Sequence, residues 1–188
     1  LGYNCMMKIT LFALFAGLLM LGGCTQELEF QVTKELAEGG DAEAQNNLGA
    51  MYATGKGVPQ DDQEAAKWFR MSAEQGAAKG QSNLGLMYEK GKGVPQDYKE
   101  AVKWYRKSAE QGYASAQYHL GVKYAKGKGV PQDYKEAYAW WSVAKANGDE
   151  LAVTNLGIVT KEMTKEQIAE AQSLATEIQK RIEANKKD

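Results

Sequence analysis

Few residues of the chain could carry out chemistry. His119 is the only histidine, and both cysteines, Cys5 and Cys24, lie in the first 24 residues. A catalytic triad would need His119 as its base, and a histidine-based metal site would need more ligands than one imidazole. We therefore expect no catalytic residue, no metal site and no cofactor.

Other patterns that suggest a metal, a phosphate or a nucleic acid have simpler explanations. Asp61, Asp97 and Asp133 are spaced 36 residues apart, and helix N-capping accounts for all three. The glycine pairs are not followed by the Lys-Ser/Thr of a phosphate loop. The chain has 23 basic and 24 acidic residues and no basic stripe, so we expect no nucleic-acid partner.

The N-terminal segment resembles a bacterial secretion signal. Lys8 is followed by residues 9–21, thirteen residues without a charge. This run is too short to span a bilayer but has the length of the apolar region of a signal peptide. It ends in Leu21-Gly22-Gly23-Cys24, which resembles the lipobox, where small residues precede a cysteine that becomes lipidated. The alternative is an apolar N-terminal helix with an incidental cysteine.

The lipobox resemblance implies a location. Cys24 would become the first mature residue and carry the acyl chains, and residues 1–23 would be a signal peptide. Residues 24–29 would link the membrane to the fold. Thr25, where an aspartate would favour the inner membrane, suggests sorting to the outer membrane. We therefore expect a lipid-anchored periplasmic protein; whether the extension at residues 1–5 is translated stays open.

Most of the chain consists of a repeat of 36 residues. A Leu-Gly pair, the sequence Gly-x-Gly-Val-Pro-Gln-Asp and a tryptophan each recur at this spacing, as does a single glycine. These single glycines are Gly40, Gly76, Gly112 and Gly148. A fixed period of this length is the sequence signature of a solenoid.

Each repeat predicts two helices, here called helix A and helix B. An apolar stripe follows one face of the first helix A: Ala44, Leu48 and Tyr52. Gly49 lowers the helix propensity beside this stripe, which indicates that a neighbouring helix approaches closely. Asp61 would cap helix B, with Glu64 three residues later, as in a capping box. The residues that helix B should bury are Ala65, Trp68 and Phe69.

These residues and their spacing resemble the Sel1-like repeat, a relative of the tetratricopeptide repeat. The resemblance implies an all-α fold, a right-handed α/α solenoid whose helix A lines the concave side. It also implies a protein-binding scaffold or adaptor. Penicillin-binding or β-lactamase activity has been claimed for cysteine-rich members of the family, but the repeats here contain no cysteine.

The 36-residue period also sets the expected boundaries. The repeats should occupy 40–75, 76–111 and 112–147, with a partial copy at 148–163. Solenoid ends need capping elements. We expect an N-terminal capping helix, 30–39 with a start near Glu27, that acts as a lone helix B and covers the first repeat with Leu28, Val32, Leu36 and Ala37. Residues 164–188, opened by Thr164-x-x-Gln167, should form the ninth helix and close the last open groove.

Positions that differ between the copies are the candidates for partner binding. On the face of helix A opposite helix B, one column is apolar: Ala50, Leu86, Val122 and Ile158. A neighbouring column carries amides or imidazole: Asn47, Asn83, His119 and Asn155. Tyr118 lies beside them, so the centre of the site should be Leu86, Val122, Tyr118 and His119. Alternatively, curvature buries the apolar column and the amides bond between adjacent A helices.

The favoured function is a non-catalytic scaffold that binds a protein of the cell envelope in the groove lined by helix A. We expect a monomer held to the membrane through Cys24. Two alternatives stay open. One is an immunity lipoprotein that neutralises a secreted antibacterial effector, and the other is a β-lactamase-like hydrolase.

Overall fold

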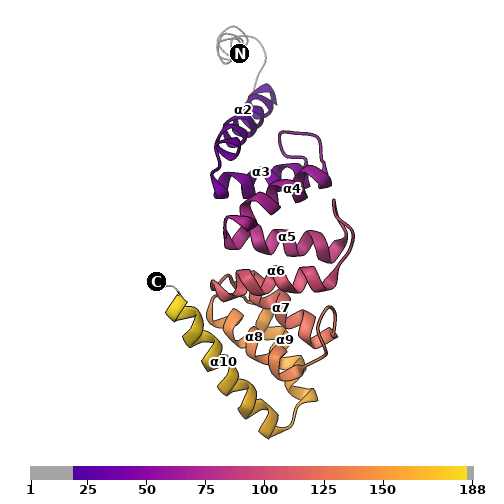
Figure 1. The fold of residues 1–188 in the computed structure, drawn as a ribbon, viewed down its shortest axis with the longest axis vertical. Helices are drawn as coiled ribbons and strands as arrows, with labels where there is room; N and C mark the ends of the chain where they lie inside the picture. Colours follow the sequence, from indigo (N-terminus) through magenta and orange to yellow (C-terminus); the bar gives the residue numbers. More distant parts are fainter. Residues whose placement is uncertain (1–18, 186–188) are drawn as a thin grey trace.

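The computed structural model describes residues 19–185, with side chains from Thr25 onward. Over this range the chain forms nine α-helices, one short 3₁₀ segment and no strand (Figure 1). The elements are α2 (Leu19–Glu38), α3 (Ala42–Thr54), α4 (Asp62–Glu74), α5 (Ala78–Lys90), α6 (Tyr98–Glu110), α7 (Ala114–Lys126), α8 (Tyr134–Ala146), α9 (Leu151–Val159), η1 (Thr160–Glu162) and α10 (Lys165–Asn185). Among these described helices, none is long and apolar enough to cross a membrane.

The helices pack in the order of the sequence. The three A–B pairs are α3 with α4, α5 with α6, and α7 with α8, and each helix B also packs against the helix A that follows it. Figure 1 shows the resulting stack, with α2 at one end and α10 at the other. The predicted all-α solenoid of nine helices is confirmed for the described part of the chain.

The residues that recur in every repeat form the core. Those that are fully buried are Leu48, Leu84, Leu120, Ala65, Ala101 and Ala137. The helix A glycines act as predicted, because a Cβ on Gly49 would lie 2.7 Å from Phe69 Cδ1 and one on Gly85 would lie 2.9 Å from Tyr105 Cδ1. The missing side chain therefore lets an aromatic ring of helix B pack directly on the backbone of helix A.

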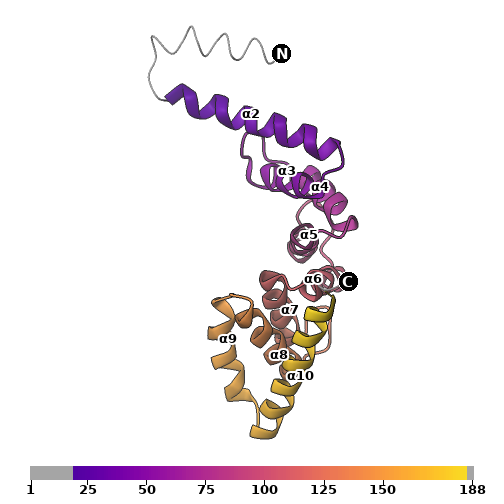
Figure 2. The same cartoon turned by 90° about the vertical axis from the view of Figure 1, so that its left-hand side faces the viewer.

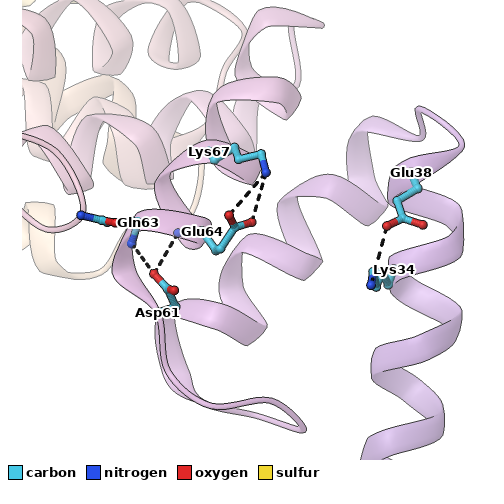
Figure 3. A network of polar contacts seen from close by, with 6 residues as sticks. All are labelled: Lys34, Glu38, Asp61, Gln63, Glu64 and Lys67. Carbon is cyan, nitrogen blue, oxygen red and sulfur yellow. Dashed lines mark hydrogen bonds and ion pairs between the residues drawn. The ribbon is translucent and has the colours of Figure 1, made fainter.

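The repeated aspartates cap helix B. Asp61 Oδ1 accepts hydrogen bonds from the backbone N–H groups of Gln63 and Glu64, at 2.9 and 3.0 Å (Figure 3). The equivalent caps of α6 and α8 are Asp97 and Asp133. The Glu64 carboxylate lies 3.4 Å from Lys67 Nζ, farther along the helix (Figure 3). Capping thus explains the conspicuous aspartates without a metal ion.

The N-terminal helix covers the first repeat with a face that differs from the predicted one. Phe30 and Ala37 are buried in the first hydrophobic cluster, whereas the three large apolar residues expected there are mostly exposed: Leu28 (61%), Val32 (49%) and Leu36 (55%). The prediction for those three is wrong because the expected helix B turns other positions toward the first repeat. Phe30 and Ala37 precede Ala66 and Ala73 by one period, and helix B turns these positions toward the next helix A.

The predicted linker, residues 24–29, is helical, because α2 begins at Leu19. Contacts with the loop after α3 stabilise this part of the helix. Lys56 Nζ donates to Glu29 Oε1 at 2.8 Å, and a Cβ on Gly57 would lie 2.7 Å from the Gln26 carbonyl oxygen. Residues 1–18 of the predicted signal peptide and the side chain of Cys24 lie outside the described residues.

The C-terminal end also departs from prediction. α9 packs on α8 as the helix A of a fourth repeat, but α10 packs on α8 and α6 instead of on α9. Figure 2 shows α9 and α10 on opposite sides of α8. The capping box of α10 forms as expected, since Thr164 N donates to Gln167 Oε1 at 2.9 Å and Gln167 N donates to Thr164 Oγ1 at 3.2 Å. The prediction that this helix closes the last groove is wrong.

The position of α10 has a physical cause in the third repeat. Ala139 and Val143 are buried on α8, where α6 has the exposed Lys103 and Lys107 one period earlier. The outer face of α8 is therefore apolar and needs a cover. The apolar stripe of α10 supplies that cover with Ala171, Ile178 and Ile182.

Candidate functional site

The apolar column of helix A becomes more exposed toward the C-terminal end. Leu86 on α5 and Val122 on α7 are half-buried, and Val122 packs against the largest hydrophobic cluster. Ile158 on α9 is 59% exposed. Leu86 and Val122 are thus partly covered within the solenoid, whereas Ile158 is largely open.

The amide column bonds between adjacent A helices. Asn83 Nδ2 on α5 donates to Asn46 Oδ1 on α3 at 2.8 Å, and Asn46 Nδ2 donates to Asn47 Oδ1 at 3.3 Å. This arrangement is the local alternative that the sequence left open. Asn47 is exposed, whereas Asn83 and Asn155 are half-buried. In the first two repeats, these amides therefore hold helix A to helix A.

His119 differs from the asparagines of its column. Its imidazole stacks on the Tyr105 ring, with a centroid distance of 5.0 Å and an interplanar angle of 8°. Tyr118 meets the imidazole edge-on at 5.5 Å. Three rings from α6 and α7 thus come together at the boundary between the second and third repeats, where the sequence predicted the centre of the site.

A buried ion pair lies beside these rings. The Lys123 ammonium contacts a Glu89 carboxylate oxygen, and the Lys123 side chain is only 2% exposed. The other Glu89 oxygen, Oε2, accepts a hydrogen bond from the Tyr105 hydroxyl at 2.8 Å. Glu89, Tyr105 and Lys123, here called the polar triad, therefore join α5, α6 and α7.

The polar triad sets the charge states of the site. Burial alone would raise the pKa of Glu89, but the hydrogen bonds from Lys123 and Tyr105 outweigh it and hold that pKa below its usual value. Burial, with the carboxylate of Glu89 nearby, raises the pKa of Tyr105. Burial lowers the pKa of His119, although Glu89 partly opposes this effect. At neutral pH the site thus presents the neutral imidazole of His119 beside Tyr118, over the buried Tyr105 and its satisfied ion pair.

The polar triad was not predicted from the sequence, although the repeats carry a signal for it. Lys123 occupies a buried helix A position that holds methionine in the two preceding copies, Met51 and Met87. A charged residue at such a position needs a partner of opposite charge. The carboxylate that replaces a small apolar residue at an equally recurrent position is Glu89, which follows Ala53 by one period.

The arrangement suits binding better than catalysis. His119 is held by ring stacking, and the described residues contain no group of three or more His, Cys, Asp or Glu side chains placed to hold a metal ion. The nearby carboxylate is engaged by Lys123 and Tyr105. The half-buried Tyr118 and His119 can instead make hydrogen bonds and stacking contacts with another molecule.

A family model for the Sel1 repeat matches residues 42–76, 78–113 and 114–149. These matches give three copies, as the period predicts, with boundaries displaced by one or two residues. No curated protein matches the chain significantly.

Solved structures with this fold are similar to the chain. One is c5321, a protective antigen of uropathogenic Escherichia coli strains that displays an SLR fold, with 37% identity and a TM-score of 0.77 over 81% of this chain and 33% of the antigen. A Sel1 repeat protein from Oxalobacter formigenes has 40% identity and a TM-score of 0.65 over 70% of this chain and 56% of that protein. The chain thus spans between a third and somewhat over half of these relatives.

A third structure shares the fold at a lower identity. Cysteine-rich protein B of Helicobacter pylori matches with 24% identity and a TM-score of 0.55, over 69% of this chain and 96% of that protein. Residues 25–188 of the present chain contain no cysteine. The likeness to this relative therefore concerns the helical arrangement alone.

Proposed function

The chain belongs to the Sel1 repeat family, and we propose that it is a scaffold that holds a partner protein of the cell envelope on its helix A face. Sel1 repeat proteins are generally scaffolds for protein–protein interaction. In such solenoids, neighbouring repeats build one extended surface that serves for binding. The proposed partner site is the part of this surface around α5 and α7.

The observation that carries this proposal is that the copies differ on the helix A face but hardly differ in their core. Core, capping and turn residues are nearly the same in the three repeats, because each has the same packing role. The third repeat nevertheless places Tyr118 and His119 where the second has Ser82 and Asn83. The backbone accepts either pair of residues, so the fold does not require the two rings. Their stacking with Tyr105 gives a rigid aromatic surface that is typical of binding hot spots.

The proposed location depends on Cys24. What supports it is the sequence Leu21-Gly22-Gly23-Cys24 after an uncharged run. The described contacts of α2 with the first repeat are also compatible with processing at this point. Gln26, Glu29 and Phe30 make these contacts, and all three follow Cys24 in the chain.

Capture from an envelope extract tests the binding site. The bait is the full chain, and the sharpest variant is Tyr118→Ser with His119→Asn, which gives the third repeat the residues of the second. A second bait carries Leu86→Asp and Val122→Asp. We expect both variants to lose the proteins that the wild type retains, since each changes the proposed contact surface.

Met71→Asp is the matched control, because Met71 is 37% exposed on α4, outside the proposed site. This bait should retain the same proteins as the wild type, and circular dichroism should show the same helix content for all baits. Equal capture by the wild type and the Tyr118/His119 variant would show that the partner does not bind at the proposed site.

Metabolic labelling with a fatty acid analogue tests the tether. Labelled wild type should sediment with membranes, and Cys24→Ser should lose the label. Thr25→Ser is the matched control and should keep it. A label that persists after Cys24→Ser would contradict lipidation at this cysteine.

A further inference from the structure

The two ends of the solenoid are complementary halves of one repeat. α2 packs in the position of a helix B, because its contacts repeat those of the other B helices one period later. Gly57 approaches the carbonyl oxygen of Gln26 just as Gly93 approaches that of Asp62. Likewise, Gln45 Nε2 donates to the Ala37 carbonyl oxygen at 3.1 Å, the bond that Gln81 makes to Ala73.

The face of α2 that would cover a helix A of its own is apolar and exposed. Val32 and Leu36 take the positions of Trp68 and Ser72, and Ser72 Oγ donates to a carbonyl oxygen of the helix A in its own repeat, at 2.6 Å. Together with Leu28, they form a stripe that is between 49% and 61% exposed. This surface, the α2 stripe, has the chemistry of an interface between helices.

At the other end, α9 is a helix A without a helix B. It packs on α8 as expected, but a Cβ on Gly157 would meet no atom within 4 Å, whereas one on the equivalent Gly121 would lie 2.6 Å from Trp141. Val153, 49% exposed, replaces the glutamine that the three complete repeats hold at this position. Val153 and Gly157 form this uncovered surface, here called the α9 face, and Leu151 and Ile158, 64% and 59% exposed, lie on the adjoining side of α9 that turns away from helix B.

Both ends thus contradict the usual design of a solenoid, whose terminal elements turn a polar face outward. Three of the exposed residues are apolar where complete repeats have polar ones: Leu28 replaces a glutamate, Leu36 a serine and Val153 a glutamine. α2 and α9 lie at opposite ends of the stack (Figure 1), and the exposed apolar residues on both helices need covers. Each end has the helix that the other lacks.

We infer that a second copy of the chain packs head to tail on the first, with its α2 stripe on the α9 face. The α2 of one copy then serves as the missing helix B of the other. Thr33 takes the position of the ring that packs on the helix A glycine, so a small side chain would lie over Gly157 without a clash. The inferred contact gives an assembly in place of the monomer that we expected from the sequence. It leaves the helix A face around Tyr118 free.

The charges at this junction are complementary. Lys161 stands three periods after Ala53, at the position that Glu89 occupies in the second repeat. Glu89 bonds to Tyr105, which corresponds to Thr33 in α2. Lys161 of one copy would therefore lie next to Thr33 and within one turn of Glu29 in the other copy. α9 itself carries no charged residue that would repel the acidic α2.

A contact between two different faces is heterologous and joins copies in an open series. Sedimentation velocity of the purified full chain tests it with two one-sided variants. Val32→Asp damages the α2 stripe, and Val153→Asp damages the α9 face. The wild type should form dimers and larger species, and each variant should sediment as a monomer, with self-association weakened about 100-fold or more by the buried carboxylate.

An equal mixture of the two variants is the decisive sample. Each retains the face that the other has lost, so the mixture should form a dimer and nothing larger. Lys161→Glu, at an exposed residue, should leave the fold unchanged and weaken association several-fold. Met71→Asp, which adds the same charge outside both ends, should associate like the wild type.

Three results would overturn the inference. A wild type that stays monomeric at its highest soluble concentration would show that the ends are covered in another way or bind another molecule. A mixture of the two variants that stays monomeric would exclude the head-to-tail contact. Dimers formed by either variant alone would indicate a symmetric interface instead.

Discussion

The first two junctions between repeats use the same backbone but opposite chemistry. At the first, Phe69, Ala53 and Met87 pack together in an apolar cluster. At the second, the equivalent residues form the polar triad of Tyr105, Glu89 and Lys123. A buried ion pair contributes little net stability compared with well-packed apolar residues, because desolvation offsets the attraction. Apolar and charged side chains therefore both fit this junction without a change of backbone. We infer that the charges of the polar triad have a role other than stabilising the fold.

Removing one member of the ion pair between Glu89 and Lys123 should give the largest loss in the free energy of unfolding. Glu89→Ala places at this position the residue found at Ala53 and Ala125, but it leaves the Lys123 ammonium buried without its carboxylate. We expect a loss of about 3 kcal/mol in the free energy of unfolding, measured by urea denaturation. The matched change Ala53→Gly should cost only about 1 kcal/mol, the loss in helix propensity. A similar small loss for Glu89→Ala would mean that water reaches Lys123.

Replacing the helix A glycine with alanine should have opposite effects on stability in α7, where a helix B covers the glycine, and in α9, where none does. Gly121→Ala would bring a Cβ within 2.6 Å of Trp141 Nε1, so the ring must move, at a cost of about 1–3 kcal/mol. Gly157→Ala meets nothing within 4 Å and should stabilise the chain by up to about 1 kcal/mol through helix propensity. Thermal unfolding of both variants at low protein concentration measures the difference. Equal destabilisation would mean that α9 is covered.

Converting the second junction into the first should cost little stability. The triple variant Glu89→Ala, Tyr105→Phe and Lys123→Met exchanges the polar triad for the residues of the apolar cluster. We expect its free energy of unfolding to lie within about 1 kcal/mol of the wild type, or above it. Capture of the envelope partner should nevertheless decrease, because the hydrogen bonds that position the Tyr105 ring under His119 are gone. Unchanged capture would mean that the polar triad has no role in binding the partner.

These contrasts explain which features could be predicted from the sequence. A position that recurs three times reveals its role by repetition, so the buried Leu48, the caps such as Asp61 and the bare Gly49 were all predicted correctly. The polar triad occurs once, and it is meaningful only when Glu89 and Lys123, 34 residues apart, are considered together. A repeat period does not reveal a pair of interacting residues that occurs only once.

The ends were harder to predict for a related reason. An apolar stripe predicts that a helix face is covered but does not say by which element. The α2 stripe was assigned to the first repeat, although the period places Phe30 and Ala37 there. The stripe of α10 was assigned to the last open groove, although Ala139 and Val143 on the outer face of α8 offered a second apolar surface. A choice between two apolar faces requires the three-dimensional arrangement.

The smallest expected effect is a pH dependence found at the second junction and not at the first. Burial lowers the pKa of His119 from its usual value of 6.5, so the folded chain resists protonation that the unfolded chain accepts. The unfolded state then binds more protons, and the free energy of unfolding falls as the pH drops below about 6.5. One proton limits the slope to about 1.4 kcal/mol per pH unit.

His119→Asn gives this position the residue of the first two repeats and should abolish the effect between pH 7 and 5.5, as measured by urea denaturation. The lowered pKa of Glu89 acts in the same direction, but only as the pH falls through its usual value of 4.5, where the unfolded carboxyl begins to take up protons. The variant should therefore keep that second, more acidic loss of stability. An identical loss near pH 6 in the wild type and the variant would mean that the ring stack leaves the His119 imidazole open to water, and the contrast between the two junctions would then rest on the ion pair alone.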